Sequence, residues 1–152
     1  NSSFRGQDLL IQSSKGDLPE QFEYDFTGCP DLAQTCAVTL CALGIPFRFT
    51  GTKTLRVKET DRIAALGNEL RKVGFLLQDD PAGEWLAWDG SHCEPEKDPV
   101  FATYHDHRMA MAFAPLAITR GRVYMDDPGV VSKSYPGFWE DLKKAGFKIS
   151  GS

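Results

Sequence analysis

Apolar and polar residues alternate in several short stretches in the first half of the chain. Residues 22–26 alternate aromatic with acidic side chains, and residues 47–49 read Phe-Arg-Phe. A period of two indicates a strand with one buried face. We therefore predict strands there, at the Leu-Leu-Ile run of residues 9–11, and at residues 54–58, where Leu and Val alternate with polar residues.

Four longer stretches repeat their apolar residues at helical spacing, as Ile63, Leu66 and Leu70 do in one of them. Such spacing places the side chains on one helix face. Asp, Thr or Ser stands at each start, and a glycine follows three of the ends. Pro115 should kink or shorten the third helix. The predicted helices begin at Asp31, Thr60, Asp106 and Ser134 and end at residues 43, 73, 116 and 145.

Further strands are predicted in the second half of the chain. Residues 75–77 and 84–89 flank an Asp-Asp-Pro-Ala-Gly sequence, which predicts a hairpin. The remaining predicted strands are residues 100–104, 123–125 and 147–149, with a turn at residues 128–129.

The sequence contains an internal repeat. Residues 69–75 (Glu-Leu-Arg-Lys-Val-Gly-Phe) match residues 141–147 (Asp-Leu-Lys-Lys-Ala-Gly-Phe), and residues 8–10 match residues 84–86. Recurrence at nearly constant spacing indicates a repeated structural unit. We predict an α/β (α+β) fold of two repeated strand-helix units, at about residues 6–80 and 81–152.

Corresponding ends of the two units should face similar surroundings. Lys58, ahead of one helix, corresponds to Lys133, ahead of the other. The repeat therefore predicts that Arg62, Arg108 and Lys133 converge at one end of the sheets.

Composition limits the classes of function. The chain has 152 residues, 41% of them hydrophobic, which suits one domain or one piece of a larger one. The net charge of -4 argues against general nucleic-acid binding and makes a local group of cations more notable. The longest apolar run, residues 109–118, is about half of a membrane span, and the first residues carry no signal-peptide pattern.

The cysteine pattern indicates a reduced protein. Cys29, Cys36, Cys41 and Cys93 form no Cys-x-x-Cys pair and show no metal-ligand spacing. We therefore expect no metal site from them. Cys36 and Cys41 lie in an apolar helical stretch and should be small core residues, in a reduced, cytoplasmic-type protein.

Charged residues crowd around the predicted start of the second helix, at Arg56, Lys58, Glu59 and Arg62. Free N–H groups and the helix dipole favour an anion there, and added cations favour a phosphate or carboxylate. Glu59 among these cations is held ionised, and it can relay a proton when substrate closes over it. The alternative is a solvated helix start with scattered salt bridges.

A second charged group occupies residues 104–108. His105 and His107 form a His-x-His pattern without a third ligand, so a metal site is not favoured. Arg108 in a first helical turn is poorly matched to the dipole, which suggests that it serves an anionic ligand; the alternative is pairing with Asp106. His107 is either a proton relay or a hydrogen-bonded spacer.

Asp31 and Lys133 are less distinctive by themselves. Asp31 follows Pro30 at a helix start, where Asp106 stands in the second copy, and alone it is an N-cap carboxylate. Lys133 alone is a surface lysine in a loop. The sequence shows no nucleophile triad and no glycine-rich phosphate loop.

Three motifs together resemble the 5-enolpyruvylshikimate-3-phosphate synthase family. Residues 56–62 (Arg-Val-Lys-Glu-Thr-Asp-Arg) with residues 69–74 resemble one signature, residues 106–111 (Asp-His-Arg-Met-Ala-Met) a second and residues 127–136 a third. The resemblance implies two inside-out α/β barrel-type domains of three similar units each, with the site in the cleft between them. Residues 1–152 would be a partial C-terminal domain, without its first unit and without the N-terminal domain.

The resemblance also implies an activity. The family transfers the enolpyruvyl group of phosphoenolpyruvate to the 5-hydroxyl of shikimate 3-phosphate and releases phosphate, in the shikimate pathway to aromatic amino acids. The implied partners are these substrates and the missing N-terminal domain, with no cofactor, metal, nucleic acid or membrane. We expect the fragment to fold but not to turn over alone. The alternatives are the related transferase acting on UDP-N-acetylglucosamine and a non-catalytic anion-binding module.

The resemblance implies roles for residues of the first unit. Asp31 would hold the shikimate hydroxyls and accept a proton, Lys58 would contact shikimate 3-phosphate, and Glu59 would exchange a proton at the methylene carbon of phosphoenolpyruvate. Thr54 departs from the family pattern, because it stands where an asparagine often touches the shikimate substrate.

The resemblance implies a second set of roles at phosphoenolpyruvate. Arg62, Arg108 and Lys133 would clamp its phosphate and carboxylate, and Lys133 would also assist proton transfer to the leaving phosphate. His107 is included among the substrate-binding residues.

Overall fold

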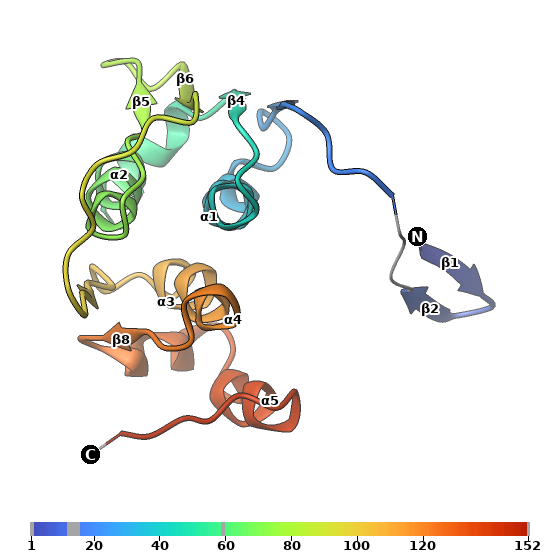
Figure 1. Cartoon of the computed structure of the whole chain (residues 1–152). Coiled ribbons are helices and arrows are strands. Elements are labelled where there is room, and N and C mark those ends of the chain that lie inside the picture. Colours follow the sequence, from blue (N-terminus) through green and yellow to red (C-terminus); the bar gives the residue numbers. More distant parts are fainter. Residues whose placement is uncertain (1, 12–15, 59, 152) are drawn as a thin grey trace.

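The computed structural model of the chain describes residues 2–11, 16–58 and 60–151 (Figure 1). Its strands are β1 Ser2–Arg5, β2 Asp8–Ile11, β3 Phe22–Asp25, β4 Phe47–Thr50, β5 Gln78–Asp79, β6 Trp85–Trp88, β7 Val100–Phe101 and β8 Tyr124–Met125. The largest sheet has the order β3-β4-β6-β5, with β3 and β4 parallel and β6 antiparallel to its neighbours. β7 and β8 form a parallel pair, and β1 and β2 form an antiparallel hairpin beside the body.

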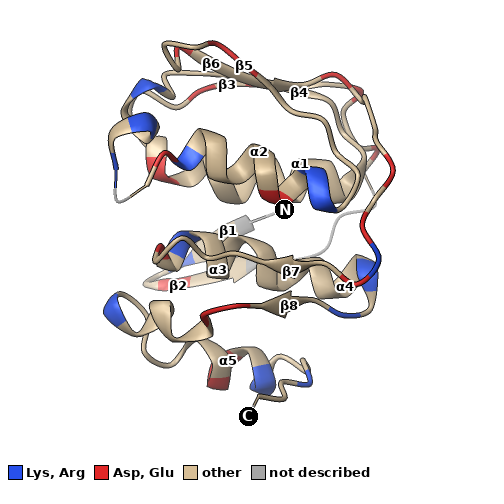
Figure 2. Ribbon diagram, turned by 90° about the vertical axis from the view of Figure 1, so that its left-hand side faces the viewer, with Lys and Arg blue, Asp and Glu red and all other residues tan. Residues whose placement is uncertain are grey.

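Helices connect and separate these sheets. The α-helices are α1 Ala33–Leu43, α2 Arg62–Lys72, α3 His107–Phe113, α4 Ala117–Arg120 and α5 Phe138–Lys144. The 3-10 helices are η1 Pro30–Leu32, η2 Lys53–Val57, η3 Ala114–Leu116 and η4 Pro128–Lys133. Figure 2 shows α1 and α2 beneath the four-stranded sheet, with α3 between them and β8.

The core fills the space between the sheets and these helices. On β4, Phe47 and Phe49 point inward and Arg48 outward, as the alternation predicted. They join Leu66 of α2 and Phe113 of α3 in one buried cluster. Each fully buried Phe or Leu contributes about 1.5–3 kcal/mol relative to an exposed one, so the helices are held firmly against the sheet.

The order of elements repeats. β3-α1-β4-η2-α2 is followed along the chain by β7-α3-β8-η4-α5, and each helix α1 or α3 links two parallel strands. Gly74 and Gly146 follow the last helix of each copy with positive φ of 98° and 100°. The chain is therefore a mixed α/β structure with an internal repeat, and the predicted unit boundaries stay a prediction.

The strand predicted at residues 54–58 is wrong. Residues Lys53–Val57 form the 3-10 helix η2, in which the Leu55 N–H donates to the Thr52 carbonyl at 2.9 Å. Leu55 is buried while Val57 is 82% exposed, so the alternation does not mark one buried face. Two apolar residues are too few to separate a strand from a tight turn.

The N-cap of the second helix lies one residue later than the predicted start at Thr60. Asp61, rather than Thr60, is the N-cap of α2, and its Oδ1 accepts hydrogen bonds from the N–H groups of Ile63 and Ala64 at 3.1 and 3.0 Å. Both residue types suit an N-cap, and the sequence alone favoured the wrong one.

Two predicted strands are wrong for a shared reason. After α2, the Phe75 N–H donates back to Leu70 O at 3.0 Å, so Phe75 forms only an isolated antiparallel bridge with His92, and pairing with β6 begins at Gln78. After α5, the Phe147 N–H donates back to Leu142 O at 3.0 Å, and residues 147–149 form no strand. In both copies the helix end takes the N–H group with which we expected a strand to begin.

The third and fourth predicted helices, which correspond to α3 and α5, differ in how well they were predicted. The third helix ends at Phe113 and Pro115 lies in the 3-10 turn that follows, so the expected shortening is confirmed. The last helix begins at Phe138 rather than at Ser134, because the N–H groups of Ser134 and Tyr135 both donate back to Val131 O, at 3.1 and 2.8 Å, and so continue the preceding 3-10 turn.

Candidate functional site

The starts of α2 and α3 lie at the same end of the molecule (Figure 2). Asp106 is the N-cap of α3 and accepts a hydrogen bond from the Arg108 N–H at 2.9 Å. Its carboxylate also receives Arg62 of α2, with Nε–Oδ2 at 2.6 Å and Nη2–Oδ1 at 3.3 Å. The Arg62 side chain is 2% exposed and that of Asp106 is 0% exposed. A buried two-point ion pair therefore joins the two repeats.

Three cations converge on Asp31, which lies in η1. Arg62 Nη1 is 2.8 Å and Lys58 Nζ 3.4 Å from its Oδ1, and Arg108 Nη2 is 3.2 Å from its Oδ2. Asp31 caps no helix by its side chain, so the N-cap interpretation is wrong. We call Asp31, Lys58, Arg62 and Arg108 the Asp31 cluster; it draws on both repeats.

The charges of the Asp31 cluster set the protonation of its carboxylate. Partial burial favours the neutral acid, but the positive charges of Arg108, Lys58 and Arg62 outweigh this and lower the pKa of Asp31. Asp31 is therefore ionised at neutral pH and acts as the internal counterion of three cations.

The Asp31 cluster is open to solvent on one side. The side chains of Asp31, Lys58 and Arg108 are 36%, 33% and 30% exposed, in contrast to the buried Arg62. An anion approaching from solvent can therefore reach the two exposed cations directly. The guanidinium of Arg62 is buried and bound to Asp106, so only part of it is available to such an anion.

His107 lies at the edge of this arrangement. Its Nδ1 is 3.9 Å from Asp106 Oδ1, which is beyond hydrogen-bond distance. His105 is 90% exposed and lies 3.9 Å from Asp127 instead, so the two histidines do not act together. Within the described residues, no group of three or more His, Cys, Asp or Glu side chains could hold a metal ion.

Lys133 and Glu59 are not brought into the Asp31 cluster by what the structure describes. Lys133 ends η4, whose Val130 and Val131 pack against Ala110 of α3. Its side chain is exposed and makes no ion pair within residues 2–11, 16–58 and 60–151. Glu59 lies outside the described residues.

Arg56 does not belong to the anion site, contrary to the sequence interpretation. Its Nη1 donates to Asp61 Oδ2 at 3.0 Å, and its Nη2 donates to the Asp80 carbonyl at 2.8 Å and pairs with Asp79. The positive charge of Arg56 is therefore bound by other residues of the fold.

A second buried contact was missed from the sequence. Glu69 of α2 is almost fully buried and accepts hydrogen bonds from Tyr104 Oη at 2.9 Å and from the Ala102 N–H at 3.0 Å, and Lys72 pairs with it at 2.7 Å. Tyr104 and His105 both have positive φ, which is strained for residues with a side chain. An acidic residue on the helix face that also carries Leu66 and Leu70 was the available signal.

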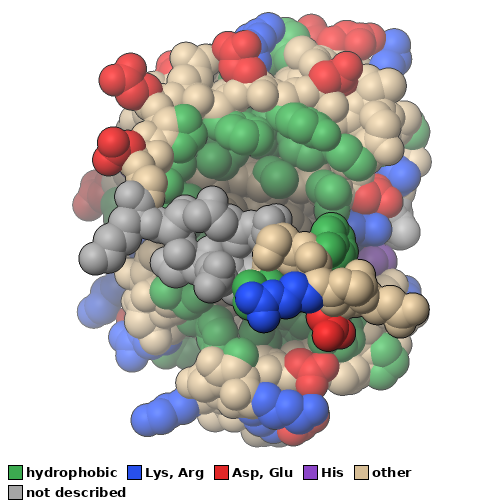
Figure 3. All heavy atoms as spheres, turned by 90° about the vertical axis from the view of Figure 1, so that its right-hand side faces the viewer, with side chains coloured by type: hydrophobic (Ala, Val, Ile, Leu, Met, Phe, Trp, Pro, Cys, Tyr) green, Lys and Arg blue, Asp and Glu red, His purple; other side chains and the backbone are tan. Residues whose placement is uncertain are grey.

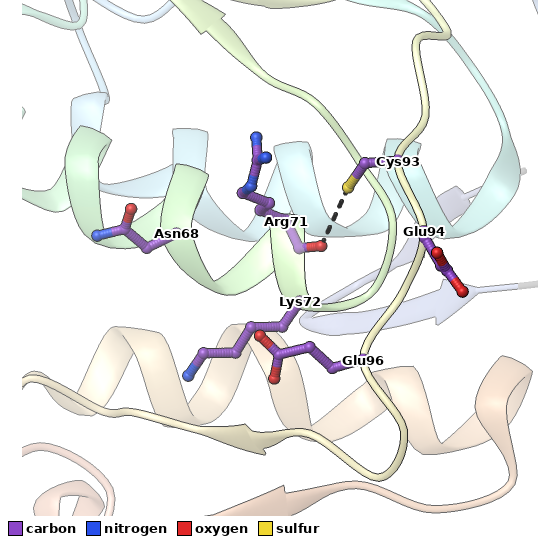
Figure 4. Close-up of a pocket in the computed structure, with 6 residues that line it drawn as sticks. All are labelled: Asn68, Arg71, Lys72, Cys93, Glu94 and Glu96. Atoms are coloured by element: carbon purple, nitrogen blue, oxygen red, sulfur yellow. Dashed lines mark hydrogen bonds between the residues drawn. The ribbon is translucent and has the colours of Figure 1, made fainter.

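Two hollows of the surface do not coincide with the Asp31 cluster. One, of about 350 Å³, lies at the end of α2, where the Cys93 thiol donates to the Arg71 carbonyl at 3.4 Å (Figure 4). Its side chains carry mixed charges and mainly close the helix end. A second, of about 440 Å³, is lined by Thr60, His105 and two aspartates, which disfavour an anionic ligand. None of the helices in the described part of the chain is long and apolar enough to cross a membrane.

Comparison with known proteins gives one consistent family. The model of the family described as EPSP synthase (3-phosphoshikimate 1-carboxyvinyltransferase) matches residues 9–142. A 3-phosphoshikimate 1-carboxyvinyltransferase of Bacteroides fragilis is 54% identical over 134 residues, which are 88% of this chain and 32% of the relative. Those of Methanoculleus marisnigri and Cellvibrio japonicus are 37% identical, covering 90% and 88% of this chain and 31% of each relative.

The match covers most of this chain but only part of each relative. The chain spans about a third of the length of the curated relatives that it matches. The matched residues 9–142 include all of the Asp31 cluster and most of the two repeats that build it. The chain belongs to the EPSP synthase family.

Proposed function

We propose that this chain is the C-terminal part of an enzyme that transfers the enolpyruvyl group of phosphoenolpyruvate to the 5-hydroxyl of shikimate 3-phosphate. The observation that carries the proposal is the convergence of Lys58, Arg62 and Arg108 on Asp31. Two highly anionic substrates require cations, and their reaction requires a carboxylate acid–base among those cations. The names of the relatives support the same activity.

Asp31 would accept the proton of the 5-hydroxyl group. In the free protein its lowered pKa makes it ionised but a weak base. Substrate anions that share the charges of Arg62 and Arg108 would reduce this lowering. The base would then become stronger when the substrates are in place.

Each of the other residues would bind one of the two substrates. Arg62 and Arg108, with Lys133, would bind the phosphate and carboxylate of phosphoenolpyruvate, and Lys58 would contact shikimate 3-phosphate. The buried pairing with Asp106 makes Arg62 a fixed point, whereas the exposed Arg108 can adjust to the ligand.

Three assignments implied by the resemblance complete this proposed site. His107 would join the substrate-binding residues, and Glu59 would exchange the proton at the methylene carbon of phosphoenolpyruvate. Lys133 would assist proton transfer to the leaving phosphate. No cofactor or metal is required by this scheme, because cations and carboxylates of the chain supply the charge and the proton transfer.

A longer protein would complete the fold and the cleft. By the match of residues 8–10 with 84–86, the β1–β2 hairpin corresponds to β5–β6, whose β6 pairs with β4. Among the described strands, β2 pairs only with β1, and β3 is an edge strand. Apolar side chains also gather on the face shown in Figure 3. These features support a preceding unit and an N-terminal domain, with residues 6–80 and 81–152 as two units of an inside-out barrel.

The test is activity in the presence of a complementary N-terminal portion. We expect turnover of phosphoenolpyruvate and shikimate 3-phosphate only in the completed enzyme, and weak or no binding by this chain alone in calorimetric titrations. Turnover with UDP-N-acetylglucosamine instead would support the related transferase. Anion binding without turnover of either acceptor by the completed protein would support a binding module and refute the proposal.

The cellular location stays a prediction from the cysteine pattern. Cys29, Cys36, Cys41 and Cys93 are all free thiols in the structure. We propose a cytoplasmic protein on the basis of this pattern.

A further inference from the structure

Arg56 lies two residues before Lys58 but takes no part in the Asp31 cluster. Its guanidinium is bound by the Asp61 and Asp79 carboxylates and by the Asp80 carbonyl. The side chain is 21% exposed, so these bonds are partly shielded from water. Hydrogen bonds between ionised groups are about twice as strong as neutral ones. Arg56 is therefore a fixed cross-link rather than a ligand-binding cation.

Through Asp61, Arg56 ties together the two elements on either side of Lys58. Asp61 uses Oδ1 to cap α2, accepting from the Ile63 and Ala64 N–H groups, and uses Oδ2 to receive Arg56 at 3.0 Å. Arg56 belongs to η2 and Asp61 precedes α2. The ion pair therefore brackets the short segment that carries Lys58.

The β5–β6 hairpin completes this cross-link. Asp79 and Asp80 come from the hairpin, and the Thr52 hydroxyl donates to the Gly83 carbonyl at 2.7 Å. A Cβ on Gly83 would lie 2.9 Å from Arg56 Cγ, and Gly83 has a φ of +78°. Only glycine fits that turn without displacing the arginine, so the hairpin is shaped around the stem of Arg56.

Val57 and Lys58, which lie between Arg56 and Asp61, have little packing of their own. Val57 is 82% exposed, and the Lys58 side chain is 33% exposed, with Asp31 as its ion-pair partner in the described residues. Residues with few buried contacts have low local stability, so the contacts on either side of them decide how firmly they are held. We propose that Arg56 is a positioning residue, which fixes this segment so that Lys58 reaches Asp31. This inference rests on the proposed function for its consequence in catalysis.

The test compares Arg56→Met and Arg56→Lys in the complete enzyme. Arg56→Met keeps the apolar stem and removes the guanidinium. We expect kcat to fall by about tenfold to a hundredfold, because small displacements of catalytic groups have effects of this size. KM for phosphoenolpyruvate should change much less, since Arg62 and Arg108 remain, and Arg56→Lys should restore part of the loss. Unchanged kcat per folded molecule with lowered thermal stability would overturn the proposal.

A second measurement does not depend on activity. The acetylation rate of each lysine in this chain can be followed by mass spectrometry. Arg56→Met should increase the rate at Lys58 severalfold, because its contact with Asp31 is loosened, and an unchanged rate would overturn the proposal. If the wild-type complete enzyme shows no enolpyruvyl transfer, the proposed function fails while this measurement still decides the role of Arg56.

Lys53→Met is the matched control. Lys53 also belongs to η2 and also pairs with the hairpin, through Glu84 at 2.8 Å. Both of these side chains are more than half exposed, at 67% and 57%. Exposed pairs contribute little, so this variant should leave kcat and the Lys58 acetylation rate unchanged.

Discussion

Asp31 and Asp106 occupy corresponding places in the two repeats, yet their surroundings differ. Asp106 caps α3 and is fully buried against Arg62. Asp31 caps nothing by its side chain, is about one-third exposed and faces three cations. One aspartate therefore serves the fold, and its counterpart faces the space that a ligand can enter. The roles of Asp31 and Asp106 are therefore decided by their burial and their hydrogen-bond partners, rather than by their place in the repeat.

The largest effect should come from breaking the buried pair. Asp106→Asn leaves the Arg62 charge buried without its full counterion and also weakens the cap of α3. Removing one partner of a buried ion pair typically costs about 3–5 kcal/mol. We expect a loss of this size in the free energy of unfolding, measured by urea denaturation at neutral pH. A loss below about 1 kcal/mol would mean that the pair does not join the repeats.

A double substitution shows whether the loss arises from removing the Asp106 counterion of Arg62. Arg62→Met with Asp106→Leu removes both charges and keeps apolar volume at the site. Such replacements are often close to neutral, so the double variant should be more stable than Asp106→Asn alone. If the double variant is no more stable than the single one, packing rather than charge explains the loss.

A smaller effect should come from the second contact between α2 and the loop before α3. Tyr104→Phe removes the hydrogen bond to Glu69 Oε1 and leaves a buried carboxylate oxygen without this donor. We expect a loss of about 1–3 kcal/mol in denaturation experiments. Tyr135→Phe is the control, because the Tyr135 hydroxyl also binds a carboxylate, Asp141 at 2.7 Å, but at an exposed position. Equal losses in both variants would contradict the role of burial.

A substitution at Gln34 should raise stability. Gln34 of α1 is fully buried; its Nε2 donates to Met109 Sδ at 3.1 Å, and its Oε1 has no hydrogen-bond partner among the described residues. Gln34→Met keeps a similar volume and removes the unsatisfied oxygen, for a gain of about 1 kcal/mol. A lower melting temperature in this variant would show that the amide has a partner in solution.

The sequence was more informative about charges than about the backbone around them. The repeat predicted that Arg62, Arg108 and Lys133 converge; Arg62 and Arg108 both contact Asp31, whereas Lys133 makes no such contact in the described part of the chain. The backbone at residues 54–58 was mispredicted because two alternating apolar residues do not define a strand. Arg56 was misassigned because its partners Asp79 and Asp80 lie on a hairpin that only the fold brings near.

The sequence also could not show that Asp31 and Asp106 have different roles. Both stand at the start of an apolar helix, so both suited an N-cap. Only the fold shows that the Asp106 carboxylate is used by the Arg108 N–H and by Arg62, whereas Asp31 receives side-chain cations. The roles assigned by resemblance to Glu59 and Lys133 stay predictions.

The smallest effect on stability should come from Asp31→Asn. Its ion pairs are partly exposed, so the free energy of unfolding should change by less than about 1 kcal/mol at neutral pH. The cations lower the pKa of Asp31 below its unfolded value of about 3.9. Its contribution is therefore complete above that value and is lost as the pH falls through the lowered pKa. The variant should lack this acid-dependent step, and an unchanged pH dependence would contradict the ion pairs.

The same variant should bind small anions more tightly. Asp31 offsets part of the positive charge of Lys58, Arg62 and Arg108 in the free protein, so a phosphate ion competes with it for these cations. Calorimetric titration with inorganic phosphate at low ionic strength should show higher affinity for Asp31→Asn than for the wild type. Asp25→Asn is the control, because the pKa of Asp25 is lowered by hydrogen bonds from Thr27 rather than by cations. Equal or weaker phosphate binding by Asp31→Asn would mean that this carboxylate organises the three cations instead of competing for them.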